Sequence, residues 1–167
     1  MAKYPLIMMA LLCLVMTGCT DKPAHNNQNI EQHNANVQPR NEQELYHYKT
    51  AFVGDNSKVS AIVHLQSYPK DLKIKHIEIE SAQSPYGLKV FFESNQDISH
   101  EALFKNAVMT FALIENVDIL YYINEQNKTV VLEYRRKGTD ERLQTMGDSL
   151  QKIGSSADLF NQYLQEP

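Results

Sequence analysis

The segment SHEALFKNAVMTFALIEN, residues 99–116, constrains the fold more than any other part of the chain. Ser99 or Asp97 can cap the exposed amides at a helix start, and Glu101 is favoured near the positive end of the helix dipole. The apolar residues of this segment cover more than one stripe of a helix, and such a helix is normally buried. The segment therefore predicts a central helix against which the rest of a domain packs.

A pair of extended segments precedes this helix. LKIKHIEIES, residues 72–81, alternates with a period of two until its phase slips at Lys75 and His76, which indicates a β-bulge. A turn at SPYG, residues 84–87, leads into LKVFFES at 88–94. The two segments predict a β-hairpin.

A second pair of extended segments follows the helix. VDILYYIN at 117–124 and KTVVLEYRR at 128–136 flank a turn at residues 125–127, which predicts another hairpin. Further helices are predicted at 56–66, from Thr139 to near Gly154, and from Ser156 onward. The order α-ββ-α-ββ-α-α predicts an α+β domain with a four-stranded, mostly antiparallel sheet and helices packed on it.

The N-terminal residues have the pattern of an export signal. The apolar run Pro5–Met16 has 12 residues. A membrane-spanning helix needs about 20, whereas the apolar part of a signal peptide has roughly 7 to 15. The run is followed by Thr17, Gly18 and Cys19, an ending that resembles a bacterial lipobox with Met16 in place of the usual leucine.

This resemblance implies cleavage between Gly18 and Cys19 and a diacylglyceryl thioether on Cys19. Two or more acyl chains would anchor the protein stably to the extracytoplasmic face of the cell membrane. The alternative is an ordinary secretory signal in which Cys19 has no special role. Because the other cysteine, Cys13, lies within the signal, no disulfide or cysteine-bound metal is expected in the folded part.

Residues 20–45 hold ten Asn or Gln and few apolar side chains, so they predict a disordered tether. The expected organisation is therefore a signal peptide at 1–18, the lipidated cysteine and tether at 19–45, and a single domain at 46–167. The chain has 16 basic and 20 acidic residues, a formal net charge of −4. This charge argues against a nucleic-acid partner.

The titratable residues of the domain do not form a recognisable motif. His64 and His76 could approach each other, but no third ligand stands at a suitable spacing, so neither a metal nor another cofactor is expected beyond the covalent lipid. Glu78 and Glu80 share one strand face about 7 Å apart. That separation would suit the paired carboxylates of a hydrolase, but it is also usual on the solvent side of a strand. No catalytic residue is assigned.

The second face of the sheet is a candidate interaction surface. One assignment of the strand faces directs five apolar side chains toward the central helix: Leu88, Val90, Ile119, Ile123 and Leu132. The opposite face then carries Phe91, Leu120, Tyr122 and Val131. Because this is much apolar surface for a solvent face, either the C-terminal helices cover it or an envelope protein partner does.

Three stretches together carry a family resemblance: YKTAFVGDNSKVSAIV at 48–63, SPYGLKVFFE at 84–93 and NAVMTFALIENVDILYY at 106–122. They resemble the bacterial domain of unknown function 4825. The resemblance implies an extracytoplasmic domain of Gram-positive, Bacillota-type cells, found in lipoproteins and attached to some membrane-sensor metallopeptidases. It implies no catalytic residue.

The sequence therefore favours a membrane-anchored binding or sensing module for a protein or cell-envelope ligand, and not an enzyme. Two alternatives stay open: an envelope hydrolase that uses domain carboxylates, and a structural envelope or spore-associated lipoprotein. The oligomeric state is not predicted.

Overall fold

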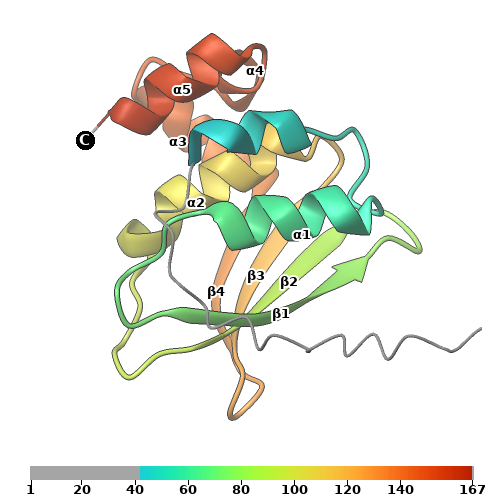
Figure 1. Ribbon diagram of the computed structural model, residues 1–167, viewed down its shortest axis with the longest axis vertical. Coiled ribbons are helices and arrows are strands. Elements are labelled where there is room, and N and C mark those ends of the chain that lie inside the picture. Colours follow the sequence, from blue (N-terminus) through green and yellow to red (C-terminus); the bar gives the residue numbers. More distant parts are fainter. Residues whose placement is uncertain (1–41, 167) are drawn as a thin grey trace, which may run out of the picture. The chain divides into compact units, whose positions relative to one another are not determined.

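The computed structural model describes residues 42–166, in which four strands form one sheet in the order β1-β2-β3-β4 (Figure 1). The strands are β1 Lys73–Glu80, β2 Gly87–Glu93, β3 Ile119–Asn124 and β4 Val130–Arg135. Both predicted hairpins are present, since β1 pairs with β2 and β3 with β4 in antiparallel fashion. The phase slip in β1 is a register shift between Ile74 and His76, which confirms the bulge at Lys75.

The two hairpins meet at a parallel seam between β2 and β3, so the sheet is mixed. The helix α2, His100–Leu113, connects these two strands. Strands joined through a crossover helix can run in the same direction, whereas a tight turn makes them antiparallel. The predicted α+β class is confirmed and the predicted element order roughly matches, and the parallel seam is the feature that the hairpin pattern did not specify.

The helix α2 is the central helix of the core, as predicted. The Ser99 hydroxyl caps its start by accepting a hydrogen bond from the Ala102 amide at 3.3 Å. Ten of its residues are buried, including Leu103, Val108 and Leu113, which are fully inaccessible. This burial explains why the apolar residues of α2 are not confined to one stripe.

Two elements precede the sheet. The 3₁₀-helix η1 spans Glu42–Tyr48, and α1 spans Asn56–Leu65 with Asp55 as its capping residue. Leu45, in η1, is fully buried in the core, so the domain begins before the expected boundary at residue 46. The expected signal peptide, Gly18, Cys19 and most of the tether lie outside the described residues.

Three helices follow β4: α3 Arg136–Thr145, α4 Leu150–Ile153 and α5 Ala157–Gln165. The single helix expected from Thr139 to Gly154 is therefore wrong. The helix α3 begins three residues earlier, directly after β4, and a break that contains Gly147, with φ +84°, separates it from α4. A positive φ is unfavourable for residues other than glycine, which explains why the chain turns there.

All of these helices lie on one side of the sheet. Figure 1 shows α1 and α2 across one sheet face, with α4 and α5 farther out, and α4 packs on α2 while α5 packs on η1. The C-terminal helices therefore do not cover the opposite sheet face, which corrects one of the two expectations for that surface. No helix within residues 42–166 is long and apolar enough to cross a bilayer.

Strand pairing also corrects the expected sides of β3. Leu120 pairs with Leu88 and Tyr122 with Val90, and both Leu120 and Tyr122 are fully buried toward the helices. Since facing residues in neighbouring strands share a side of the sheet, Ile119 and Ile123 lie instead on the face that carries none of the described helices, here called the open face. Ile119, Ile123 and Phe91 are nevertheless buried there, with 8%, 5% and 6% exposure. The expected interaction face thus retains Phe91 and Val131 and loses Leu120 and Tyr122.

A candidate ligand-binding pocket at the junction of β4 and α3

An open pocket of about 920 Å³ lies at the end of the sheet where β4 passes into α3. Its walls come from the segment after η1, the loop before β2, the end of α2, the start of β3, the β4–α3 junction and α4. Four apolar side chains form part of its lining: Phe111, Ala112, Ile119 and Leu150. The volume lies within the usual range of about 300–1,000 Å³ for small-molecule sites.

The β4–α3 junction supplies three consecutive basic residues to this pocket, Arg135, Arg136 and Lys137. The chain passes from strand to helix without a loop, because the Arg136 amide still donates to the Asp118 carbonyl at 2.9 Å in continuation of the β3–β4 ladder. The local geometry then directs neighbouring side chains differently. Arg136 is half-buried, whereas Arg135 and Lys137 are exposed.

Arg136 closes the C-terminal end of α2. Its Nε donates to the Val117 carbonyl at 2.8 Å, and its Nη2 donates to the carbonyls of Phe111 at 2.9 Å and Ile114 at 2.5 Å. These carbonyls include groups that a helix end leaves without an intrahelical partner. Burial lowers the pKa of the Arg136 guanidinium, and the carboxylates of Asp118, Asp140 and Glu115 act in the opposite direction.

Lys49, from η1's connection to α1, closes the opposite wall. Its Nζ lies 3.0 Å from Glu115 Oε1 and donates to the Gly154 carbonyl at 2.9 Å. The Tyr46 hydroxyl donates to the same carbonyl at 3.2 Å. A side chain at Gly154 would place a Cβ 2.4 Å from the Ala112 carbonyl oxygen, so this glycine is what lets α4 approach α2.

Two carboxylates in the lining hold the backbone in place. Asp118 Oδ2 accepts from the Tyr86 amide at 2.8 Å, and Asp140 Oδ1 accepts from the Leu150 amide at 2.8 Å. These bonds tie the loop before β2 and the start of α4 to the pocket wall. Asp118 and Asp140 are therefore structural supports of the pocket as well as part of its charge.

The charged groups at the pocket mouth form only exposed ion pairs. Arg135 is 63% exposed and pairs with Glu133 at 2.7 Å, and Lys137 is 88% exposed with its nearest carboxylate, Glu141, at 3.7 Å. Exposed pairs of this kind contribute little stability, so their cations can reorient toward a ligand.

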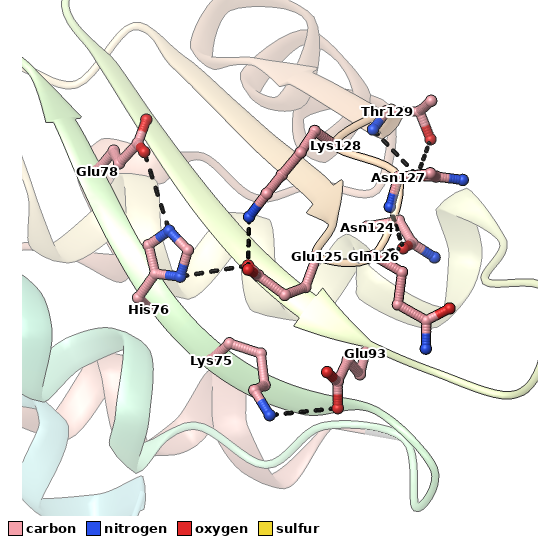
Figure 2. A network of polar contacts seen from close by, with 10 residues as sticks. All are labelled: Lys75, His76, Glu78, Glu93, Asn124, Glu125, Gln126, Asn127, Lys128 and Thr129. Atoms are coloured by element: carbon pink, nitrogen blue, oxygen red, sulfur yellow. Dashed lines mark hydrogen bonds and ion pairs between the residues drawn. The ribbon is translucent and has the colours of Figure 1, made fainter.

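The candidate residues predicted on β1 lie elsewhere, on the open face of the sheet. Figure 2 shows His76 between two carboxylates, with Nε2 at 3.8 Å from Glu78 Oε1 and Nδ1 at 3.3 Å from Glu125 Oε2. The ring of His76 stacks on Phe91 at 4.2 Å between centroids. Lys128 pairs with Glu125 and lowers the pKa of that carboxyl group.

The other predicted candidates, Glu80 and His64, form no ion pair with His76 among the described residues. Glu80 pairs with Lys89, whose pKa it raises, and borders a second hollow of about 620 Å³. His64 contacts the Ser60 carbonyl of its own helix at 2.8 Å. Among residues 42–166, no group of three or more His, Cys, Asp or Glu side chains could hold a metal ion.

The pocket residues were not identified from the sequence. Lys49, Asp118, Arg136 and Gly154 are far apart along the chain, and the fold alone brings them together. The run RRK at 135–137, at the end of a predicted strand, was the one local signal of a charged site. It stood among the polar residues of an expected strand end and helix start, where such residues are ordinary.

Comparison with known proteins adds the family. Residues 45–137 match the family model described as domain of unknown function (DUF4825). The chain belongs to the DUF4825 family. No curated protein and no solved structure matched it in the same comparisons.

The DUF4825 match covers much of the pocket but not all of it. It includes Lys49, the end of α2 and the basic run at 135–137. The wall from α4, with Leu150, lies beyond the matched residues. The pocket of this chain therefore combines the matched region with its C-terminal helices.

Proposed function

We propose that this DUF4825 protein is a membrane-anchored, extracytoplasmic binding module whose ligand occupies the pocket at the β4–α3 junction. The observation that carries the proposal is the pocket itself, about 920 Å³ in volume with apolar side chains and charged groups in its lining. A large hollow with a partly apolar lining and a few convergent polar groups is the usual form of a ligand site.

The roles of the lining residues support binding over catalysis. Arg136 closes the end of α2, and Asp118 and Asp140 hold backbone amides. A general acid or base has to exchange protons with a substrate, whereas these groups act as fixed supports. A binding site needs such a rigid frame, because a preformed pocket loses less entropy when a ligand enters.

The pocket is tested by filling it. Gln151 is an exposed residue of α4 that lines the pocket, so Gln151→Trp should block the site without disturbing the core. The matched control is Gln165→Trp, an exposed α5 position outside the pocket. Small molecules extracted from the purified full chain and identified by mass spectrometry should include a compound that Gln151→Trp loses and Gln165→Trp keeps. Equal recovery from all three proteins would exclude the pocket as the binding site.

Membrane attachment is tested at Cys19. Cys19→Ser removes the thiol that would carry the diacylglyceryl group, so the variant should leave the membrane fraction of the cell. The intact mass of the wild-type protein should exceed that of its polypeptide by the lipid. A wild-type protein without added mass, or a variant that stays equally membrane-bound, would contradict lipid anchoring.

A second candidate function is a cell-envelope hydrolase that uses Glu78. One observation favours it, the position of Glu78 beside His76, with Glu125 on the other side of the imidazole ring. If this group is catalytic, the full chain should release soluble fragments from purified cell wall, and Glu78→Gln should reduce that rate at least about 100-fold. No release by the wild-type protein, or equal rates for both proteins, would exclude this candidate.

A further inference from the structure

We propose that the pocket binds an organic anion with an apolar body, with its carboxylate or phosphate group at the mouth between Arg135 and Lys137. This inference rests on the proposed function, because it assigns a ligand class to the same pocket. Binding energy would come from the apolar body, and the cations would provide selectivity for charge.

The balance of charges in the lining supports an anionic ligand. Four basic residues, Lys49, Arg135, Arg136 and Lys137, face three acidic ones, Glu115, Asp118 and Asp140. This excess of one positive charge occurs in a chain whose formal net charge is −4. The lining itself thus carries one more positive than negative charge, and the carboxylates that pair with Arg135 and Lys137, those of Glu133 and Glu141, lie outside it on the exposed surface.

The positions of the cations further restrict where an anionic group can bind. The Arg136 guanidinium already donates to three carbonyls, and Lys49 already contacts Glu115 and the Gly154 carbonyl. Arg135 and Lys137 are the exposed cations of the lining, and each has only a surface carboxylate as its present partner. An anion that approaches them would exchange a weak surface pair for a contact at the pocket mouth.

The apolar part of the lining is the evidence that the ligand has an apolar body. Phe111, Ala112 and Leu150 are nearly inaccessible core residues that nevertheless border the pocket, and Ile119 adds a further aliphatic surface. A fully polar ligand would cover these groups without replacing its own lost hydration. A ligand with an alkyl or aromatic body would remove its own apolar surface and the small exposed part of these groups from water, which is favourable.

The test uses a series of probes with the same apolar chain: octanoate, octyl phosphate and the uncharged 1-octanol. Residues 20–167 are suitable, because they contain all of the described residues 42–166 and their hydrophobic core. Affinities are measured by following backbone amide resonances during titration. Both anions should bind at least about fivefold more tightly than 1-octanol at low ionic strength.

Two double variants separate local charge from net charge. Arg135→Gln combined with Lys137→Gln should remove the preference for anions, whereas Lys58→Gln combined with Lys70→Gln changes net charge equally at exposed positions outside the pocket and should keep it. Tighter binding of octyl phosphate than of octanoate would assign a phosphate head group, and the reverse a carboxylate.

The outcomes distinguish this inference from the proposed function. Equal binding of all three probes, blocked by Gln151→Trp, would overturn the anionic ligand class and leave the pocket as a binding site. A preference for anions that persists in the Arg135 and Lys137 double variant would also overturn the inference. Absence of binding by every probe, or binding that Gln151→Trp does not affect, would overturn both proposals for this pocket.

Discussion

At the scale of single residues, Arg136 links the end of β4 to the end of the central helix α2. It contributes backbone hydrogen bonding to the β3–β4 ladder and side-chain hydrogen bonds to the end of α2. The same residue separates the two exposed cations of the pocket mouth. Its position therefore couples the stability of the core to the geometry of the candidate site.

Replacement of this residue should be costly. Arg136→Ala leaves three carbonyls without their side-chain donor, so we expect the free energy of unfolding to fall by about 2–4 kcal/mol. Arg136→Lys should lose less, because one donor and the charge are retained. Urea denaturation measures both, with the exposed Arg135→Ala as a control that should change stability by less than about 0.5 kcal/mol. A loss no larger than that of the control would show that the three hydrogen bonds contribute little.

The alkaline stability of the domain should depend on Tyr163. Burial raises the pKa of its hydroxyl to about 12 from the ordinary value of 10.0. Below pH 10 the hydroxyl is protonated in both the folded and the unfolded chain, and the full stabilisation is present. As the pH rises from 10 toward 12, only the unfolded chain loses the proton, so the free energy of unfolding decreases.

Tyr163→Phe keeps the ring and removes the ionisable group. Its stability should therefore decrease less than that of the wild-type protein between pH 9 and pH 12, as measured by urea denaturation at a series of pH values. Buried Tyr122 and Tyr134, whose pKa values are also raised, act in the same direction in both proteins. Identical pH profiles would contradict this role of Tyr163.

Local features at this scale were predictable from the sequence, and distant ones were not. Ser99, one of the two residues expected to cap the central helix, does so, because a capping side chain bonds an amide only two or three residues farther along. Asp55 and Ser156 cap α1 and α5 in the same way. The contacts of Arg136 span 19 to 25 positions. No local pattern specifies such a pair, so the pocket could not be assembled from sequence alone.

At the scale of elements, the sequence did not show which side of β3 faces the helices. In ILYYI both alternating sets are large and apolar, so a period of two does not reveal which set faces the helices. The parallel register with β2 decides it, because that register sets Leu120 beside Leu88. The sequence predicted the strand but not its orientation.

This assignment is testable with one charge on each face. Leu120→Glu buries a carboxylate in the core and should remove cooperative thermal unfolding, with a loss of more than about 4 kcal/mol. Val131 lies on the edge strand β4 and its side chain is 39% exposed. The Val131→Glu variant should therefore unfold cooperatively near the wild-type temperature. Circular dichroism during heating measures both. A cooperative Leu120→Glu variant would mean that Leu120 is not a core residue.

The helices after β4 were harder to delimit than those before it. Arg136, Lys137 and Gly138 are polar or lack a side chain, so the first turn of α3 shows no apolar periodicity. The break between α3 and α4 depends on the backbone conformation of Gly147. Several neighbouring residues are also polar, so the sequence does not show at which of them the helix ends. The helices α1 and α2 were easier to delimit from the sequence. Buried residues form one side of α1 and most of the surface of α2.

At the scale of the whole molecule, the family match is shorter than the folding unit. The match ends at residue 137, yet five later apolar side chains belong to the core. They are Leu143, Leu150, Ile153, Phe160 and Tyr163. Lys105 of α2 also donates to the carbonyls of Leu164 at 2.8 Å and Glu166 at 2.7 Å, which fixes the end of α5 to the central helix.

A chain that ends at Lys137 should therefore not fold cooperatively. Burial of a large apolar side chain contributes about 1.5–3 kcal/mol, so the five lost residues together represent about as much as the whole stability of an ordinary domain. A chain that ends at Glu166 is the control and should unfold like the wild-type protein. Amide proton dispersion in nuclear magnetic resonance spectra measures the difference. A well-dispersed spectrum from the shorter chain would show that the matched region folds alone.

The parallel seam between β2 and β3 also determines how the sheet can assemble. Within the hairpins, paired residues such as Ile79 and Leu88 are close along the chain, whereas Gly87 pairs with Ile119 across the whole of α2. Closing a long loop loses more chain entropy than closing a short one, so either hairpin can form early while the seam has to wait until α2 docks. The sheet is in effect two locally paired units that are held together by one long-range pairing.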